Sequence, residues 1–497
     1  MPLPDAPPAP PPVTVSIVDI AVTTERVGVT AGATMGLTGL HHLRPLTPRL
    51  SLGASVFGAT SGDRGGFFAW GVTGLYRWRE GPWSAEAGLF AGGGGGSPVW
   101  VGGGLMLRPH LAVQRDLGPV RLGVGVSQVN FPNGQVNSTQ PFVTLAWSGD
   151  RLYGPPGGGP GPAGGDWPAQ AWPTEMAATF TQYTMRNGSA RRDGTGDGPP
   201  LRTGGLMLRR DLPGDWYGNW QGVRPYWLLS TAGSLTGDYA GYAEFLAGLG
   251  ARWALPSYRP LSLRVEGALG SGGGGQALDT AGGALAKLNV GVSWRPGGPW
   301  QLSALAGRIA SGGRFDANEA RLELAWLGWD VVPGPARSPD PPGAPLNWQP
   351  WTASAGWAHY PQMRRDDGSE PGLDLALLKL EREIGPHWRL VGQAGIATHG
   401  NAGGYATGQL GVGWLTRRNA VSGWRVGGEF TLGAAGGGGV RVNDGLIAQA
   451  QAQARYEFTP AWGLQFDAGW LRNHDGSLST PFVGLSAVVS YSRLQAP

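Results

Sequence analysis

A strand-like segment that carries a glutamate and then enters a block of glycines occurs three times in this chain. The three copies are Glu86 with Gly92 to Gly96, Glu266 with Gly272 to Gly275, and Glu429 with Gly436 to Gly439. Self-similarity at a fixed period identifies a repeated structural unit. At roughly 150–170 residues the unit is far longer than a solenoid repeat. We therefore expect a module of several strands that is used three times.

The composition favours a membrane β-barrel over an ordinary soluble domain. Charged residues make up 14% of the 497 residues, well below the roughly 25% of a typical soluble domain. No apolar run reaches the roughly 18 residues that a membrane-spanning helix needs. The 89 glycines and 23 tryptophans are typical of barrels whose apolar face contacts lipid and whose small or polar residues line the inside. A soluble, glycine-rich all-β protein remains the alternative.

Several kinds of chemistry have little support. The chain has no cysteine, which removes disulfides, thiol catalysis and cysteine metal sites. The net charge of +4 comes without a Lys/Arg run, so nucleic acid is not an expected partner. The glycine blocks lack the helix and lysine of a phosphate-binding loop, and no histidine has a metal-ligand spacing. We predict no catalytic residue, no metal and no cofactor, and we do not expect an enzyme.

Two stretches rich in proline and glycine divide the chain, because such segments cannot form ladder strands. The predicted divisions are a Pro-rich segment 1–12, barrel repeats 13–150, 172–331 and 349–493, linkers or loops 151–171 and 332–348, and a tail 494–497. The start Met1-Pro-Leu-Pro-Asp5 has neither the basic start nor the apolar core of a signal peptide. We therefore expect that the mature chain is shown.

Each module contains about eight strand candidates with alternating apolar and polar residues. Val120, Leu122 and Val124 alternate with Arg121, and the stretch from Trp462 to Trp470 behaves in the same way. The sixth strand of each module is predicted to begin near Val99, Thr280 and Val440. Three modules give about 24 strands. Alternation predicts strands, but a soluble sandwich would show it too.

The turns alternate between short and long, which is typical of outer-membrane barrels. The short turns are 115–119, 295–299 and 459–461, and the long loops are 131–140, 311–318 and 472–479. Five tryptophans open strands beside short turns, and they are Trp83, Trp300, Trp388, Trp424 and Trp462. Indole rings favour the level of the lipid headgroups, so we predict an aromatic girdle. The alternative is that these rings cap a soluble core.

The last strand, Pro481 to Tyr491, has Gly484 followed by apolar residues at alternate positions and ends on an aromatic residue. It is similar to the terminal strand that the barrel-assembly machinery reads, although the chain continues past Tyr491. From about Val13 to Arg493 the pattern resembles bacterial outer-membrane β-barrels of the porin or export-channel type. The resemblance implies an outer-membrane location, with membrane lipid and the barrel-assembly machinery as partners. Periplasmic export components are a further expected partner.

The resemblance implies a channel that passes solutes or an exported polymer, either polysaccharide or peptide. The alternative is a structural or adhesive surface protein that is anchored by its barrel. For the fold we prefer one transmembrane antiparallel barrel of about 24 strands over three separate barrels of eight strands. The discriminating observation is whether the first strand of each module pairs with its own eighth strand or with the preceding module.

Seven charged residues occupy strand faces opposite the apolar ones, and they are Glu86, Arg121, Arg264, Glu266, Arg425, Glu429 and Asp467. If these residues face a lumen, they would form a charged ladder that tunes the selectivity of the lumen for ions or sugars. Alternatively, they satisfy one another as ion pairs inside the wall. The glycine blocks have two interpretations as well: mobile loops at a pore mouth, or points where a strand bends sharply inward.

Overall fold

The computed structural model describes residues 14–29, 32–96, 99–160, 169–186, 198–212, 222–255, 258, 260–274, 278–333, 346–417 and 423–496. The described chain is antiparallel β structure, with a short 3-10 helix, η3, at Gly237–Tyr239. Among the described residues, no helix has the length and apolar character that crossing a membrane requires. The predicted Pro-rich segment 1–12 lies outside the described residues.

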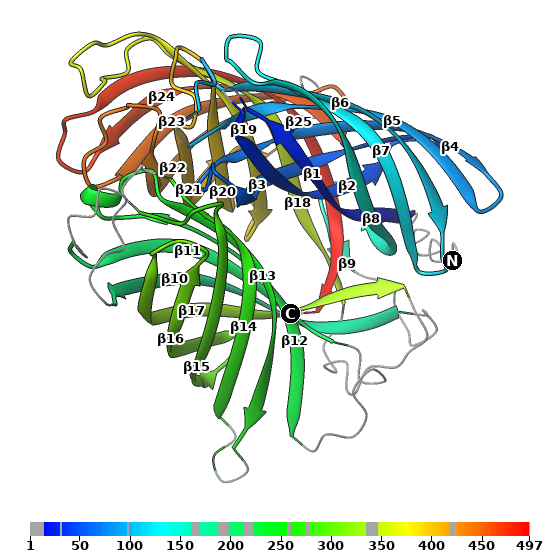
Figure 1. The fold of residues 1–497 in the computed structure, drawn as a ribbon. Helices are drawn as coiled ribbons and strands as arrows, with labels where there is room; N and C mark the ends of the chain where they lie inside the picture. The colour runs from blue at the N-terminus through cyan, green and yellow to red at the C-terminus, as the bar shows by residue number, and fades with distance from the viewer. Residues whose placement is uncertain are drawn as a thin grey trace, which may run out of the picture.

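The first module forms a closed barrel. Its strands are β1 (Thr14–Gly28), β2 (Thr34–Pro45), β3 (Leu50–Gly62), β4 (Phe68–Glu80), β5 (Trp83–Gly95), β6 (Leu105–Asp116), β7 (Val120–Asn130) and β8 (Asn137–Gly154). Each strand pairs with its neighbour in sequence, and β1 also pairs with β8 from Thr14↔Tyr153 to Glu25↔Phe142. The blue to cyan ribbon therefore closes on itself (Figure 1).

The second module closes in the same way. Its strands are β10 (Ala169–Met185), β11 (Leu201–Asp211), β12 (Val223–Ser234), β13 (Ala243–Ala254), β14 (Leu261–Gly273), β15 (Ala284–Gly297), β16 (Trp300–Ser311) and β17 (Asp316–Pro333). The closing ladder joins β10 to β17, from Ala169↔Pro333 to Met185↔Ala317. A two-residue strand, β9 (Gly159–Pro160), precedes this barrel and pairs with the start of the third.

The third module is again closed. Its strands are β18 (Asn347–Tyr360), β19 (Leu373–Glu383), β20 (Trp388–His399), β21 (Ala406–Leu415), β22 (Trp424–Gly436), β23 (Leu446–Glu457), β24 (Trp462–Asn473) and β25 (Ser479–Ala496). Here β18 pairs with β25 from Asn347↔Gln495 to His359↔Val483. The prediction of an all-β antiparallel barrel with eight strands per module is confirmed.

The preference for one barrel of about 24 strands is wrong, and the alternative of three eight-stranded barrels is what the structure shows. The first strand of every module pairs along its length with its own eighth strand. Between modules, β25 makes ladders of only two residue pairs, with β8 and with β17. Long closing ladders satisfy the edge strands within each module, so no edge is left to build a larger barrel.

The strands extend past the predicted module boundaries. β8 runs to Gly154 and β10 begins at Ala169, so both ends of the predicted linker 151–171 are strand. β17 runs to Pro333, and the predicted tail 494–497 belongs to β25 as far as Ala496. The end of β25 continues past Tyr491 because it pairs there with the neighbouring barrels. Similarly, strand extends into the predicted loop 131–140, because β8 already begins at Asn137.

The apolar face of the strands points outward and the charged face points inward. On β7, Leu122, Val124 and Val126 are exposed, whereas Arg121 is buried. The same holds on the other barrels, where Leu269 is 68% exposed and Glu266 only 3%. Water-soluble proteins rarely expose apolar surface on this scale, but a surface in contact with lipid requires it. The three barrels are therefore transmembrane.

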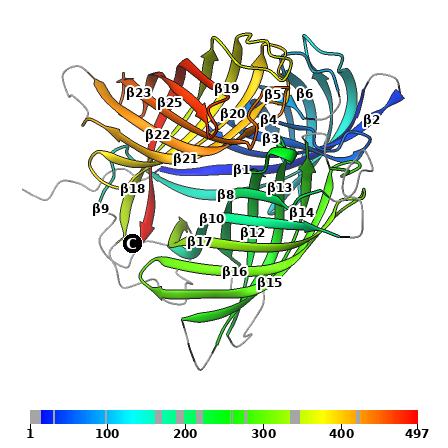
Figure 2. The same cartoon turned by 90° about the vertical axis from the view of Figure 1, so that its left-hand side faces the viewer.

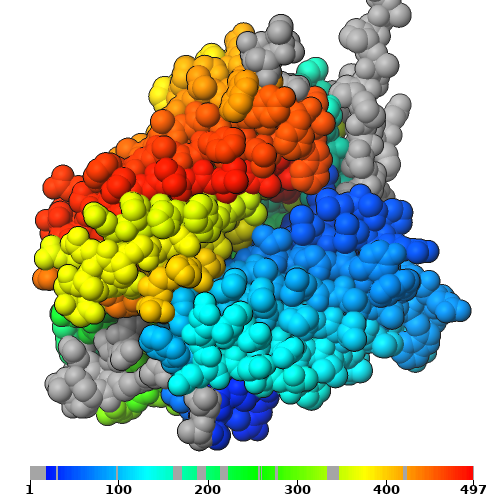
Figure 3. All heavy atoms as spheres, turned by 90° about the horizontal axis from the view of Figure 1, so that it is seen from above, coloured from blue at the N-terminus to red at the C-terminus, as the bar shows by residue number. Residues whose placement is uncertain are grey.

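The three barrels pack around an approximate threefold axis. The third strand of each barrel lies against the fifth strand of the next: β3 against β14, β12 against β22, and β20 against β5. Figure 3 shows the first barrel, in blue to cyan, directly against the third, in yellow to red. Since the same pair of strands recurs at all three seams, each barrel contacts its neighbour through equivalent surfaces.

At the end of the barrels where the short turns lie, the last strands of the three barrels converge. β8, β17 and β25 contribute Leu152, Val331 and Leu494 to one buried apolar cluster with Ala171 and Trp348. The Tyr153 and Tyr491 rings of two barrels lie 5.4 Å apart, edge to face. The start of β18 and the end of β25 meet beside β9 at this junction (Figure 2).

The seam between the second and third barrels can be tested by cross-linking, because the chain has no cysteine of its own. A Cβ placed on Gly233 of β12 would lie 3.4 Å from the Cβ of Ala434 on β22. Disulfides usually join Cβ atoms 3.5–4.5 Å apart. We expect the variant G233C/A434C to form an intramolecular disulfide on oxidation, seen as a shift on a non-reducing gel. Either single variant serves as the control, and absence of the shift would contradict the packing.

Candidate functional site in the barrel interiors

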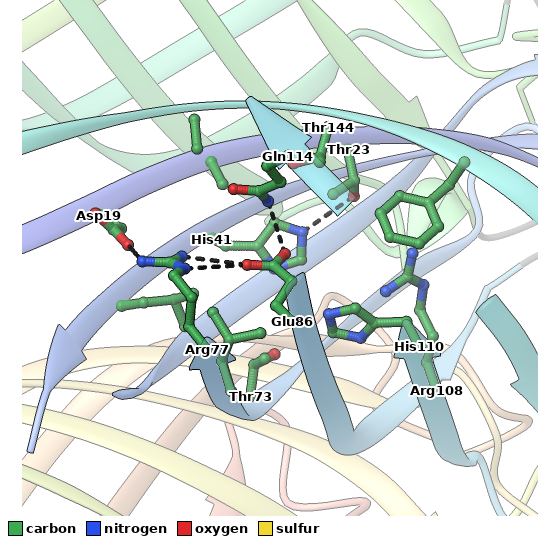
Figure 4. Close-up of a pocket in the computed structure, with 15 residues that line it drawn as sticks. Asp19, Thr23, His41, Thr73, Arg77, Glu86, Arg108, His110, Gln114 and Thr144 are labelled. Atoms are coloured by element: carbon green, nitrogen blue, oxygen red, sulfur yellow. Dashed lines mark hydrogen bonds and ion pairs between the residues drawn. The ribbon is translucent and has the colours of Figure 1, made fainter. Parts of the chain in front are cut away.

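The interior of the first barrel holds a network of buried ion pairs and hydrogen bonds (Figure 4). Asp19 accepts from Arg77 at 2.6 Å and lies 2.8 Å from an Arg121 nitrogen. Glu86 accepts from Arg77 at 3.2 Å and from the Gln114 amide at 2.7 Å. Because strands alternate their side chains, these residues from β1, β4, β5, β6 and β7 all reach the same interior.

Further from the short turns, the interior of the first barrel contains histidine and hydroxyl side chains. The His41 ring lies 3.0 Å from the Thr23 hydroxyl and 2.8 Å from the Ser55 hydroxyl. One step beyond, Glu25 accepts from Arg108 at 2.7 Å. A cavity beside these groups has a volume of about 20 Å³, enough for about one water molecule.

The second barrel has the densest network. Arg209 donates to three carboxylates, namely Glu175 at 2.6 Å, Glu266 at 2.7 Å and Glu323 at 2.7 Å. Arg264 donates to Glu175 at 2.5 Å. All these side chains are buried, and charges removed from water are retained only when they are paired and hydrogen-bonded.

A second cluster of the same barrel surrounds Glu244. Lys287 donates to this carboxylate at 2.7 Å, and the hydroxyls of Tyr183 and Tyr242 donate at 2.9 Å and 2.8 Å. Tyr183 also accepts a hydrogen bond from Lys287. Glu244 therefore has a cation and two phenols as partners, and all four side chains are buried.

The third barrel combines ion pairs with glutamines. Glu381 accepts from Arg455 at 2.8 Å and from Arg389 at 3.1 Å, while Glu429 accepts from Lys379 at 3.0 Å. Asp467 instead accepts from the side-chain amides of Gln451 and Gln465. Amide donors satisfy the carboxylate without adding charge.

At the end away from the chain termini, an apolar plug closes each interior. The plug of the first barrel includes Phe57, Phe67, Phe90, Val101, Met106 and Phe131. Equivalent buried clusters include Leu201, Tyr239, Leu278, Ile309 and Phe315 in the second barrel, and Tyr360, Met363, Tyr405, Val440 and Phe482 in the third. Each barrel thus contains two buried layers, one of packed apolar side chains and one of paired polar groups.

The segments after the glycine blocks form part of these plugs, which corrects the predicted start of each sixth strand. β6, β15 and β23 begin at Leu105, Ala284 and Leu446, several residues after the predicted Val99, Thr280 and Val440. Val101 and Val440 are buried in the plugs instead. Of the two interpretations of the glycine blocks, the inward bend is what the structure shows.

The glycines also let the barrels approach one another closely. A Cβ on Gly66 would lie 2.1 Å from the Gly274 nitrogen of the second barrel, and one on Gly404 would lie 2.3 Å from Gly96 of the first. Both residues have positive φ. A Cβ on Gly436 would meet Gly241 of the second barrel at 2.3 Å. Only glycine permits this backbone contact, and it recurs at each of the three seams.

All seven charged residues singled out from the sequence point into barrel interiors, but into three different ones. Glu86 and Arg121 lie in the first barrel, Arg264 and Glu266 in the second, and the other three in the third. They form no single ladder along one lumen. Their main partners are also mostly other than predicted, since Arg425 lies 3.3 Å from Glu457 and Glu429 pairs with Lys379.

Sequence reasoning missed the residues that have the most partners, among them Arg77, Arg209, Glu244, Glu381 and Arg455. Each occupies an inward position of an alternating strand, so the alternation could have identified them as interior residues. Their pairing could not have been read from the sequence, because Arg209 and Glu323 lie on different strands and are brought together only by closure of the barrel.

The five tryptophans predicted for the girdle are all exposed at strand ends beside short turns. Trp83, Trp300 and Trp388 each have about half of their surface exposed, at 51%, 51% and 53%. Indoles in this position suit a membrane interface. An aromatic girdle remains a prediction that depth measurements in a bilayer would test.

Outside the membrane-spanning strands, one loop is fastened to a plug segment. Asn443 donates to Asp475, and the Ser477 amide donates to the same carboxylate at 2.9 Å. These hydrogen bonds lower the pKa of Asp475 to about 2, and the bond from Asn443 has the largest effect. The carboxylate stays ionised well below neutral pH, so we expect this contact to persist in mildly acidic surroundings.

No family model matches the chain, and no curated protein matches it. Solved structures similar to it include a mutant of the ferric enterobactin receptor PfeA from Pseudomonas aeruginosa, with 10% identity and a TM-score of 0.28 over 96% of this chain and 80% of that one. The siderophore receptor PirA from Acinetobacter baumannii gives 11% identity and a TM-score of 0.28 over 96% and 80%. OprB from Pseudomonas putida has 10% identity and a TM-score of 0.23, and the match covers 65% of this chain and 94% of OprB.

Matches at such low TM-scores carry no argument about activity or ligand. The architecture itself is informative: antiparallel strands of even number in each closed barrel, apolar outside and polar inside, with tight turns such as 115–119, 295–299 and 459–461 at one end. These are the properties of bacterial outer-membrane barrels. The chain is a transmembrane β-barrel protein.

Proposed function

We propose that this chain is a structural outer-membrane protein, in which three closed barrels are locked together as one wide transmembrane unit. The observation that carries the proposal is the filling of the interiors. Each barrel has a buried ion-pair network beneath an apolar plug, and the cavity of the first barrel holds about one water molecule. An eight-stranded barrel is just wide enough for side chains to fill it.

Planar-bilayer recording tests this proposal directly. We expect the inserted protein to give no stepwise conductance, because ions would have to displace buried Arg–Glu pairs and then cross an apolar plug. A porin inserted under the same conditions is the positive control, and heat-modifiable migration on a gel verifies that the protein is folded. Stable conductance steps from the folded protein would overturn the structural role.

A channel is the second candidate, and one observation favours it. Below the plug, the first barrel is polar from Asp19 to Glu25, with His41 and Thr23 between them. Protons could pass along these hydrogen-bonded groups if the plug moved, whereas small ions would also have to displace the buried ion pairs. An exported polysaccharide or peptide is too wide for an eight-stranded barrel, so periplasmic export components fit this candidate poorly.

A further inference from the structure

An arginine faces outward at the seam between the second and third barrels, close to the short turns. Arg382 is the next-to-last residue of β19 and follows the exposed Leu380 on the same face of the strand. Its guanidinium carbon lies 4.0 Å from the centre of the Trp326 ring of β17 and 5.8 Å from that of Trp351 of β18. Aromatic rings from two barrels therefore hold this cation in place.

Within this seam, two hydrogen-bond donors have no partner. The Arg382 Nε and the Trp351 indole nitrogen are both buried, and neither has an acceptor among the described residues. In the described part of the chain, no carboxylate forms a salt bridge with Arg382. Buried donors without acceptors are costly, so an acceptor from outside the chain would stabilise the seam.

The approximate threefold symmetry supplies a comparison. Arg210 occupies the equivalent place at the end of β11, next to Arg209 as Arg382 is next to Glu381. It stacks over Trp172 at 5.3 Å, but it also has a carboxylate partner, Asp330, at 3.3 Å. The third equivalent residue, Arg44 of β2, lies 4.0 Å from the Tyr153 ring. Among these three arginines, only Arg382 has a buried nitrogen without an acceptor in the described part of the chain, and only Arg210 forms a salt bridge there.

We propose that Arg382, together with the Trp351 indole, binds the phosphate of an anionic glycerophospholipid at the seam between the second and third barrels. The phosphate group suits the guanidinium, which donates two parallel hydrogen bonds to its oxygens, and the indole adds a third donor. The position of Arg382 along the barrel also fits the level of the lipid headgroups, because the exposed Trp388 and Trp300 lie beside the short turns at the same end. Basic pockets between membrane-spanning elements bind anionic headgroups.

Native mass spectrometry of the full chain in detergent, with phosphatidylglycerol added, tests the proposal. We expect the wild type to retain one more phosphatidylglycerol than Arg382→Gln, and Arg382→Lys to retain it with weaker binding. Arg210→Gln is the matched control and should retain the lipid as the wild type does. Heat-modifiable migration checks that each variant is folded, and the site does not depend on whether the barrels conduct.

Two outcomes would overturn the proposal. Equal lipid retention by the wild type and a folded Arg382→Gln variant would show that the arginine merely reaches water past the rings. Displacement of the lipid by millimolar inorganic phosphate, with phosphate alone bound at Arg382, would assign the site to the free anion. Retention that survives phosphate and depends on Arg382 supports the lipid.

Discussion

Replacement of Arg209 by alanine is expected to lower the free energy of unfolding by about 3–5 kcal/mol or more, the range for breaking a buried ion pair. Arg209 donates to Glu175, Glu266 and Glu323 at once, and all four side chains are buried. The substitution leaves these carboxylates close together with one cation fewer, so desolvation and mutual repulsion both act against the fold. We expect a larger loss than for any other single ion-pair residue of the barrels.

The measurement is equilibrium unfolding in urea in the presence of lipid vesicles, followed by tryptophan fluorescence and by heat-modifiable migration. Arg308→Ala is the matched control, because Arg308 pairs with Asp316 at an exposed strand end and should have no measurable effect. The double variant Arg209→Ala/Glu323→Gln should recover part of the loss, since one uncompensated carboxylate is removed. Equal stability of the wild type and Arg209→Ala would mean that water reaches this network.

The second large effect concerns the seams between barrels. Gly436→Val is expected to separate the second and third barrels while each remains folded. The added Cβ would lie 2.3 Å from the Gly241 nitrogen and 2.7 Å from its Cα, and backbone at that distance must move. Gly436 is not among the residues with positive φ, so valine should be accepted within its own barrel.

The disulfide between positions 233 and 434 reports on this seam. In the G233C/A434C background, Gly436→Val should slow cross-linking several-fold, with no loss of heat-modifiable migration. Gly267→Val is the control, because a Cβ at Gly267 meets nothing within 4 Å. Unchanged cross-linking in the Gly436→Val variant would show that the glycine contacts do not hold the barrels together.

Many strand starts were predictable from the sequence. β5, β7, β16 and β20 begin at residues that the sequence pattern singled out, Trp83, Val120, Trp300 and Trp388, because a short turn or a tryptophan marks each of them. Alternation also placed Arg121, Glu266 and Asp467 on inward faces, since side chains alternate strictly along a strand. These signals are local, so no knowledge of the neighbouring strands was needed.

The sixth strands and the ion-pair partners were not predictable. The apolar stretches around Val101 and Val440 look like strand, yet they bury their side chains in the plugs instead of pairing. The partners of Arg209 come from β10, β14 and β17. Such contacts depend on the curvature and stagger of a closed barrel, which local composition does not specify.

The sequence by itself determined that the chain is antiparallel β structure in three modules of eight strands, with an apolar face and a charged face on each strand, because alternation and turn chemistry act over a few residues. The tertiary structure decided that the apolar faces point outward. Only the tertiary structure decided that each module closes on itself. Closure depends on which edge strand meets the first strand, and Thr14↔Tyr153 and its two counterparts join residues at opposite ends of a module. What distinguishes three narrow barrels from one wide pore is the filled interior, because side chains such as Arg209 and Glu323 come into contact only when each module closes on itself.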